Sequence, residues 1–391
     1  MPDQPFPRDD ELHGPVHPIP SDAHDGGPEE GMALCLSGGG YRAMLFHVGS
    51  LWRLNEAGML PRLKRISSVS GGSITAGLLG LRWKRLDWDG GGVARAFGAE
   101  LVDPVRRLAG KTIDEGAVLG GVLLPGSVGD RVEAAYRRHL FGDATLQDLP
   151  ADDEGPRFVL NASNVQSGVL WRFSRPFMGD WRVGLVRSPT LPLARAVAAS
   201  SAFPPVLSPV VLDLDPDDFD PGTGDGLTGR EFRDEVVLTD GGVYDNLGLE
   251  TAWKRYRTIL VSDAGGRFAA EADPSRDWLR HTQRILSIID GQVRSLRKRQ
   301  VMGAFREGVR SGAYWSIWTD AAEYGLDDAL PCPIDRTTLL AETPTRLKRL
   351  DDVVQERLIN WGYAVCDCAL RSRHDAALPR GSFPYPDSGI G

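Results

Sequence analysis

The sequence predicts an α/β fold in which a mostly parallel sheet carries helices on its faces. From residue 32 onwards, short apolar runs that end in glycine alternate with helical patterns, and this alternation is typical of parallel strands joined by helices. Of the 391 residues, 41% are hydrophobic and 25% are charged, as in ordinary globular proteins. The chain is therefore long and apolar enough to build one large domain around a substantial core.

Residues 1–31 differ in composition from the rest of the chain. Residues 1–30 hold eight acidic residues, one arginine and seven of the 27 prolines, without apolar periodicity. We therefore expect residues 1–31 to be a disordered acidic lead-in, residues 32–372 to form one domain and residues 373–391 to be a flexible tail. The sequence shows no secretory signal and no run of about 18 uninterrupted apolar residues, so the cytoplasm is the expected location.

The charge distribution limits the classes of partner. The net charge of the chain is −8, and the lead-in alone accounts for −7, so the remaining chain is close to neutral. Proteins that bind nucleic-acid polymers usually carry a basic surplus, and such a partner is not expected here. The four cysteines form no C-x-x-C pair, so a structural zinc site is not expected either.

The first predicted elements follow the order strand, loop, helix, strand, turn, helix. Residues 32–37 predict a short buried strand that ends in three glycines, and residues 44–54 show the apolar spacing of a helix. Residues 65–70 predict a second strand, which two glycines break, and residues 74–81 predict a helix. This succession is the beginning of a parallel sheet covered by helices.

The later elements are predicted from the same periodicities. Strands are expected at residues 157–163, 168–174, 236–238, 258–263 and 313–319, and helices at residues 92–108, 131–140, 193–200, 277–312 and 345–371. Residues 213–234 form an acidic loop rich in glycine and proline. Its spaced aspartates lack the glycine and the distal glutamate of an EF-hand, so we interpret it as a solvated loop and expect no metal.

One serine occupies the junction between a predicted strand and a predicted helix. The segment Ser68-Val69-Ser70-Gly71-Gly72 follows the G-x-S-x-G pattern of a nucleophile elbow, with Ser68 in place of the first glycine. A nucleophilic serine needs a tight turn with small neighbours, and the helix N-terminus behind it offers N–H groups to developing negative charge. The alternative is a plain serine–glycine turn, because such pentapeptides are common.

Three successive glycines follow the first predicted strand. The amides of Gly38, Gly39 and Gly40 can point into one concavity and bind an anion, such as the oxyanion of an acyl transfer. Tyr41 and Arg42 come next, without the Lys-Ser/Thr of a Walker loop or the glycine spacing of a dinucleotide site. The alternative is a tight turn.

An acidic residue also stands at a strand end. Asp240-Gly241-Gly242 follows a predicted strand directly, where open α/β sheets place the side chains of their sites. The alternative is a turn aspartate that binds its own backbone, and Asp263 before Gly265 has the same appearance.

The histidines do not predict a Ser-His-Asp triad. None of the seven follows a late strand, where a triad in the order serine, acid, histidine requires it. They are His13, His17, His24, His47, His139, His281 and His374. A serine paired directly with a carboxylate is the simpler chemistry, and it needs no cofactor.

In this order, the GGGxR loop, the serine turn and the DGG turn resemble those of the patatin-like phospholipases, in particular bacterial ones. The resemblance is specific in residues 34–75, 199–204 and 238–250 and looser over residues 32–370. It implies a three-layer α/β/α sandwich, with residues 32–372 as the catalytic domain. It further implies that Ser70 is the nucleophile and Asp240 its base. The implied oxyanion site comprises Gly38, Gly39, Gly40, Arg42 and Gly71.

Ser68 replaces the family's usual glycine, and Ser37 stands where many relatives have aspartate. The implied activity is hydrolysis of phospholipid acyl esters, of phospholipase A or lysophospholipase type, with transient membrane contact. Alternatives are a thioesterase or another serine acyl hydrolase on the same site, and a regulatory protein without catalysis. The resemblance also implies a role as a membrane-degrading effector in antiviral defence, with a cyclic nucleotide as activator, although the chain contains no recognisable sensor domain.

The helix predicted near residues 276–310 has two interpretations. The segment holds nine basic and three acidic residues beside a set of apolar residues. A basic amphipathic helix can lie on anionic lipid. We favour the alternative, in which the apolar side packs into the core and the basic face is solvated, because a large domain needs such helices.

Overall fold

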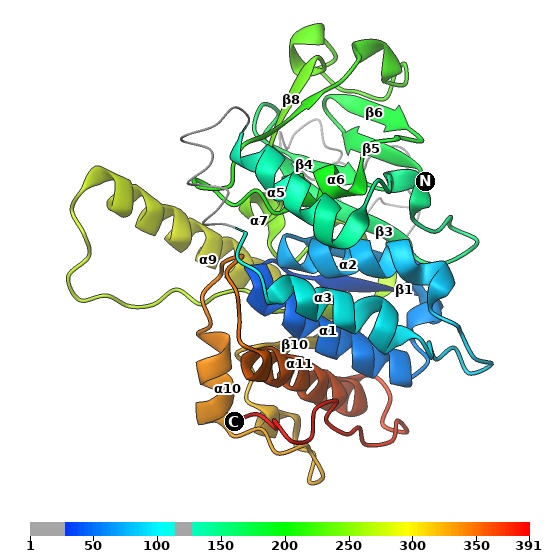
Figure 1. Ribbon diagram of the computed structural model, residues 1–391, viewed down its shortest axis with the longest axis vertical. Helices are drawn as coiled ribbons and strands as arrows, with labels where there is room; N and C mark the ends of the chain where they lie inside the picture. Colours follow the sequence, from blue (N-terminus) through cyan, green and yellow to red (C-terminus); the bar gives the residue numbers. More distant parts are fainter. Residues whose placement is uncertain (1–27, 114–126) are drawn as a thin grey trace.

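The computed structural model describes residues 28–113 and 127–391, and within them ten strands form one sheet (Figure 1). The strand order is β10-β9-β1-β2-β3-β4-β5-β6, and β8 pairs with both β3 and β7. The strands are β1 (Glu29–Leu36), β2 (Leu63–Val69), β3 (Arg157–Asn164), β4 (Leu170–Phe173), β5 (Phe177–Asp180), β6 (Gly184–Arg187), β7 (Val210–Asp213), β8 (Glu235–Asp240), β9 (Tyr256–Asp263) and β10 (Ser311–Ser316).

The sheet has a parallel part and an antiparallel part. Strands β10, β9, β1, β2 and β3 are parallel, whereas β4, β5, β6, β7 and β8 join by antiparallel pairing. The parallel strands all end at the same edge, as expected for strands connected by helices.

Helices cover both faces of the sheet. They are α1 (Gly40–Glu56), α2 (Gly71–Arg82), α3 (Asp103–Ala109), α5 (Val128–Tyr136), α6 (Leu193–Ser200), α7 (Gly242–Asp245), α8 (Glu250–Trp253), α9 (Trp278–Arg306), α10 (Ile334–Ala341) and α11 (Asp352–Arg373). Leu34 and Leu36 of β1 share a core with α1, α2 and α11, whereas Ala33 and Cys35 face a second core that includes α8 and α9. Both faces of β1 are therefore buried, and the predicted three-layer α/β/α fold is confirmed.

The junction of β2, β3 and β8 brings two distant chain segments together. One edge of β3 pairs with β2 over Arg157–Asn161 and then with β8 over Ala162–Asn164, while β4 occupies its other edge. Because β2 is parallel to β3 and β8 is antiparallel to it, the ends of β2 and β8 meet head to head. Asp240, the last residue of β8, pairs with Ala162, one residue beyond the pairing of β2.

Helix α9 departs from the core packing that the sequence led us to favour. Its C-terminal half contributes Val301 and Phe305 to the second core, as expected. Its N-terminal half extends away from the body (Figure 1), and several of its large apolar side chains, including Ile285 and Ile289, are exposed. Apolar periodicity shows that a helix has an apolar face, but it does not show what that face meets. None of the helices in residues 28–113 and 127–391 is long and apolar enough to cross a membrane.

The C-terminal segment lies against the body, whereas the sequence led us to expect a flexible tail. The side chain of Ile390 is buried, and the Asn360 amide on α11 donates to the carbonyls of Tyr385 (2.7 Å) and Gly389 (2.7 Å). At the other end of the chain, the first strand begins at Glu29, which pairs with Arg255 at 2.9 Å. The lead-in before residue 28 lies outside the described residues.

Candidate active site

Ser70 stands on a strained turn between β2 and α2. Its φ of 53° and ψ of −121° lie in a region that L-residues rarely adopt, and such outliers concentrate at functional sites. Its amide donates to the carbonyl (3.2 Å) and to the hydroxyl (3.1 Å) of Ser200. The last residue of α6 thus holds the turn in place. Ser70 has 8% of its surface exposed to solvent.

Ser68 is accommodated by a chain of hydroxyl groups. Its buried Oγ lies 3.0 Å from Ser73 Oγ, which lies 2.8 Å from Ser200 Oγ. Ser200 Oγ in turn donates to the carbonyl of Asn161 at 2.6 Å. A serine at this position therefore supports the turn of Ser70. Sequence reasoning recognised residues 199–204 as a family motif but gave Ser200 no such role.

The glycine loop and the serine turn touch each other. A Cβ atom on Gly71 would lie 2.2 Å from the carbonyl oxygen of Gly40, and one on Gly38 would lie 3.1 Å from the Cβ of Ser70. Side chains at these positions would push the two turns apart. Glycine is therefore required here by close approach, beyond any preference for a turn.

The amides of the loop are not all available. The Gly38 amide donates to the carbonyl of Asn246 at 3.1 Å. Within the described residues, the amides of Gly39, Gly40 and Gly71 meet no hydrogen-bond acceptor. Gly39 has a φ of 144° and Gly40 a φ of 61°, both in the region that favours glycine. The loop thus presents free donors next to Ser70, which is the chemistry of an anion site.

Asn246 is a neighbour of the site that sequence reasoning missed. A Cβ on Gly38 would lie 2.4 Å from its Oδ1, and one on Gly265 would lie 2.9 Å from its Nδ2. Its side chain therefore fills the space between the glycine loop and the turn after β9. Asn246 lies within residues 238–250, which resemble the family, but the sequence analysis gave this asparagine no role.

Asp240 is a buried carboxyl group beside the Ser70 turn, with 1% of its surface exposed. Burial raises its pKa to about 7, against the lowering effects of the Gly242 amide and the Ser70 hydroxyl, and Asp290 raises it further. The Gly242 amide donates to Oδ1 at 2.7 Å. Although Ser70 lowers the pKa of this carboxyl, Oδ2 has no hydrogen bond of regular geometry among the described residues. Hydrogen bonds of catalytic groups are often loose without substrate.

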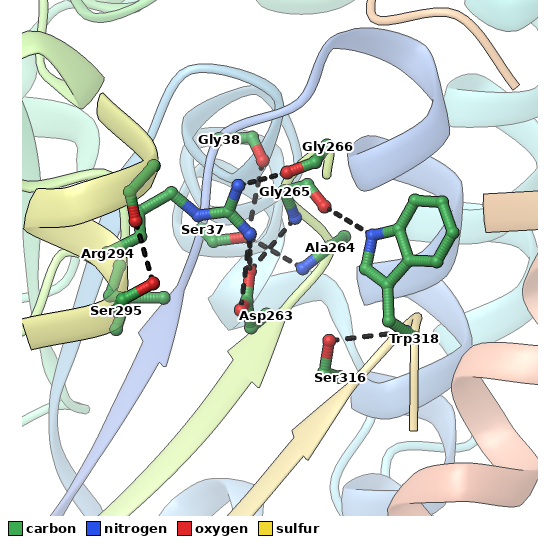
Figure 2. Close-up of polar contacts among 12 residues, drawn as sticks. Ser37, Gly38, Asp263, Ala264, Gly265, Gly266, Arg294, Ser295, Ser316 and Trp318 are labelled. Atoms are coloured by element: carbon green, nitrogen blue, oxygen red, sulfur yellow. Dashed lines mark hydrogen bonds and ion pairs between the residues drawn. The ribbon is translucent and has the colours of Figure 1, made fainter. Parts of the chain in front are cut away.

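Asp263, the rival acid, has both oxygens engaged. It accepts hydrogen bonds from the Tyr314 hydroxyl (2.7 Å) and the Gly265 amide (2.9 Å), and Arg294 lies 3.4 Å away. Burial raises its pKa, but Arg294 and Tyr314 outweigh that effect, so the pKa lies below its ordinary value. Figure 2 shows Arg294 over Asp263 and the glycine turn that follows it. This carboxylate is a structural ion-pair partner.

Arg42 holds the loop after β9 rather than pointing to Ser70. Its guanidinium donates to the carbonyl of Ala264 (3.0 and 3.2 Å) and to the carbonyl of Thr343 (2.6 Å). Burial and the nearby Arg294 lower its pKa to about 10, which leaves it charged at neutral pH. In this conformation Arg42 positions the glycine loop against its neighbours.

His47 is a buried structural residue on α1, next to the start of the glycine loop. Its Nε2 contacts the Ser37 carbonyl at 2.9 Å and its Nδ1 contacts the Ser262 hydroxyl at 2.9 Å. Burial lowers its pKa to about 4, so the ring is neutral, with Nε2 as the donor and Nδ1 as the acceptor. Ser37 accepts a hydrogen bond from the Ala264 amide at 2.8 Å and so connects the two loops (Figure 2).

A cavity of about 520 Å³ lies between α9 and the carboxyl ends of β9 and β10. The Asp263–Arg294 pair forms part of its wall. Two cations in the wall lie over aromatic rings, Arg267 over Trp318 and Lys298 over Tyr314, both at 4.9 Å. Neither Ser70 nor Asp240 lines this cavity, so it is a neighbour of the candidate site. No group of three or more metal-ligating side chains occurs in the part of the chain that the structure describes.

The chain is similar to known proteins in sequence and in structure. The sequence model of the patatin-like phospholipases matches residues 34–253, more than half of the chain. Among solved structures, human GIVD cytosolic phospholipase A2 is 14% identical, with a TM-score of 0.49, over 88% of this chain and 61% of that one. VipD from Legionella pneumophila is 12% identical, with a TM-score of 0.34, over 86% of this chain and 66% of that one.

The chain therefore spans less than two thirds of the length of either structure. No curated protein matches the sequence. The family match nevertheless covers both the glycine loop and the DGG turn. This protein belongs to the patatin-like phospholipase family.

Proposed function

We propose that this protein is a lipid acyl hydrolase of phospholipase A or lysophospholipase type, in which Ser70 is the nucleophile and Asp240 its base. The observation that carries the proposal is the meeting of these residues at the edge of β3. There a strained serine faces a buried carboxyl group with a pKa near 7. A carboxylate of ordinary pKa is a weak base, and this burial brings it close to the neutral range in which a general base is most effective.

In the proposed first step, Asp240 accepts the hydroxyl proton of Ser70 while Oγ attacks the ester carbonyl carbon. The carbonyl π electrons move to oxygen and form a tetrahedral oxyanion. As the intermediate collapses, the carbon–oxygen bond to the alcohol breaks and protonated Asp240 returns its proton to the leaving oxygen. The products are an acyl-serine and a lysophospholipid or free alcohol.

In the second step, water loses a proton to Asp240 and attacks the acyl-serine carbonyl. A second oxyanion forms and collapses, which breaks the bond to Oγ. Ser70 regains its proton from Asp240, and the fatty acid leaves. Atoms and charges balance over the two steps, and each step uses the same two side chains.

The oxyanion is proposed to bind to the free amides around Ser70. Gly39, Gly40 and Gly71 meet no acceptor among the described residues, so they can donate without breaking an existing bond. One such donor typically contributes about 3 kcal/mol to the transition state. The Gly38 amide is engaged with Asn246, and we propose that Gly38 serves mainly to leave room beside Ser70. Arg42 then acts by fixing the loop.

The decisive experiment compares Ser70→Ala and Asp240→Asn with wild type on phospholipid vesicles and on a soluble short-chain ester. Each change should remove nearly all hydrolysis, and the double variant should be little worse, because paired groups act as a unit. A fluorophosphonate probe should label wild type and fail to label Ser70→Ala.

His281→Ala, at an exposed position on α9, is the matched control and should keep the wild-type rate on the soluble ester. The melting temperatures of the variants show whether unfolding causes any loss of activity. Full activity in folded Asp240→Asn would reject the pair.

A further inference from the structure

Six of the described large apolar side chains of α9 are exposed, and four of them form a stripe along the helix. These four are Trp278, Ile285, Ile289 and Leu296, with exposed fractions of 79%, 43%, 54% and 59%. Successive members are seven, four and seven residues apart, which places them on one side of a helix with 3.6 residues per turn. We call this set the α9 stripe. A group of large exposed apolar side chains on one side of a helix is typical of an interaction site.

The other side of the helix fixes the orientation of the α9 stripe. Val301 is buried in the second core, and Arg297 donates to Glu250 at 2.8 Å. The Arg294 guanidinium donates a hydrogen bond to the Gly266 carbonyl and lies 3.4 Å from the Asp263 carboxylate. By helical spacing these anchors lie away from the stripe. A rotation of α9 that turned the stripe inwards would break these anchoring contacts. The stripe therefore faces outwards.

Exposed basic side chains accompany the stripe. Arg276, Arg299 and Arg306 are exposed and have no carboxylate partner among the described residues. By helical spacing, Arg299 and Arg306 flank one margin of the stripe. Arginines beside an apolar stripe can keep their charged ends in the headgroup layer while the apolar side chains enter the acyl region. A tryptophan at the end of such a helix suits the same interface.

We infer that the α9 stripe docks on a lipid surface that contains anionic headgroups. A second copy of this chain is a poorer occupant, because self-association through the stripe would bring like-charged arginine margins together. Lipid offers both an apolar interior for the stripe and negative charge for its margin. This inference extends the proposed function and rests on lipid as the substrate.

The location of α9 suits such a role. Helix α7 begins at Gly242, two residues after Asp240, and packs against α9. Asp290 of α9 is close enough to raise the pKa of Asp240. Asp290 lies on the anchored side of the helix, so a membrane bound to the α9 stripe lies across α9 from Asp240, about one helix diameter (~10 Å) further out.

The test measures binding without hydrolysis. Full-length Ser70→Ala protein is sedimented with sucrose-loaded vesicles of phosphatidylcholine, alone or with phosphatidylglycerol. Adding Ile285→Ser and Ile289→Ser should lower the partition coefficient on anionic vesicles by about tenfold or more. The matched control is Leu339→Ser with Val353→Ser, two exposed apolar positions on α10 and α11, and it should leave binding unchanged.

A second pair of variants tests the charge. Arg299→Glu with Arg306→Glu should weaken binding to anionic vesicles several-fold and leave binding to phosphatidylcholine alone nearly unchanged. All variants with Ser70 restored should hydrolyse a soluble ester at the wild-type rate, which separates docking from catalysis. If hydrolysis fails in every protein but vesicle binding follows this pattern, the proposed function is wrong and the docking inference stands.

Two results would overturn the inference. The first is wild-type vesicle binding by the Ile285→Ser/Ile289→Ser variant. The second is a wild-type dimer that the same variant converts to monomer while vesicle binding persists, because the stripe would then be an interface between two copies. Sedimentation velocity without lipid decides the second case.

Discussion

Asp240 and Asp263 occupy equivalent positions in the sequence, yet their surroundings give them different chemistry. Each ends a strand and precedes a glycine turn. The oxygens of Asp263 are satisfied by Tyr314, Gly265 and Arg294, whereas Oδ2 of Asp240 has no regular partner in the described structure. The sequence left both open as bases, because burial and partners from distant segments are not written in the local motif.

The pKa of Asp240 predicts the pH dependence of hydrolysis. Only the ionised carboxyl can accept the Ser70 proton, and burial raises its pKa to about 7. We therefore expect kcat/KM for a soluble ester to rise with pH through about 7 and then level off. Initial rates across the neutral range measure this. An acidic limb near the ordinary carboxyl value of 3.8 would show that Asp240 is not the titrating base.

The same pKa predicts how stability depends on pH. Because the folded-state pKa is raised above the ordinary value of 3.8, the stabilising contribution of protonated Asp240 is complete below 3.8 and is lost as pH rises to about 7. Asp240→Asn removes this titration. Between about pH 5 and about pH 8 the variant should gain roughly 2–3 kcal/mol relative to wild type, at 1.36 kcal/mol per pKa unit. Urea unfolding at both pH values measures the difference, and a constant difference would contradict the burial argument.

At the scale of elements, α1 and α11 approach through two glycines. A Cβ on Gly49 would lie 1.9 Å from the Ile359 carbonyl oxygen, and one on Gly362 would lie 1.9 Å from the Phe46 carbonyl oxygen. Gly49→Ala or Gly362→Ala should force the helices apart and lower the free energy of unfolding by about 3 kcal/mol.

Gly303 provides the matched control for this pair. It lies within α9 and a Cβ there would meet nothing within 4 Å. Gly303→Ala should stabilise the protein by about 0.5–1 kcal/mol, because alanine has the better helix propensity. Denaturant unfolding compares the three variants. Equal effects at all three positions would show that propensity, and not contact, determines the result.

Helix α9 uses neighbouring basic residues for different purposes. Arg297 donates to the buried carboxylate of Glu250 at 2.8 Å, whereas Arg299 is exposed and, among the described residues, donates only to the Ser295 carbonyl of its own helix. Arg297→Glu should lower the free energy of unfolding by roughly 2 kcal/mol or more, since it leaves Glu250 facing a like charge. Arg299→Glu should change it by less than about 0.5 kcal/mol. Thermal melts of both variants decide the matter.

Most elements could be predicted from periodicity, because buried strands and amphipathic helices repeat over six or more residues. The helix expected at residues 193–200 is observed with the same ends. Strands β5 and β6 were not predicted, because each has only four residues and contains glycine. The orientation of α9 was missed for another reason: apolar spacing alone cannot distinguish a core face from an exposed one.

At the scale of the molecule, the C-terminal segment after α11 packs against that helix. Ile390 is buried, while Asp387 three residues earlier is exposed. Ile390→Ser should lower the free energy of unfolding by about 2 kcal/mol, through lost apolar burial. Asp387→Ala should leave it unchanged, and calorimetry can compare the two. If both variants melt like wild type, the segment contributes nothing to stability.

The meeting of Ser70 and Asp240 could be proposed from family motifs, whereas the local sequence alone does not determine it. Their proximity depends on the pairing of β8 with β3 directly after the end of the β2 pairing, on the same edge of β3. Strand direction and edge choice are set by long-range pairing, and no periodicity encodes them. The motifs contain Ser70 and Asp240, and they also contain Ser200 and Asn246, but they do not show that Ser200 and Asn246 hold the surroundings of the pair.

The head-to-head arrangement of β2 and β8 has a consequence for the order in which the chain is made. A nascent chain that has emerged as far as β3 already contains the serine turn, but about seventy more residues must be made before the strand that carries Asp240. The ribosome adds roughly 5–20 residues per second, so this takes several seconds. Under the proposed mechanism, the growing polypeptide holds a nucleophile without its base. Under the same mechanism, hydrolysis requires β8, so truncated products that end before β8 are expected to be inactive.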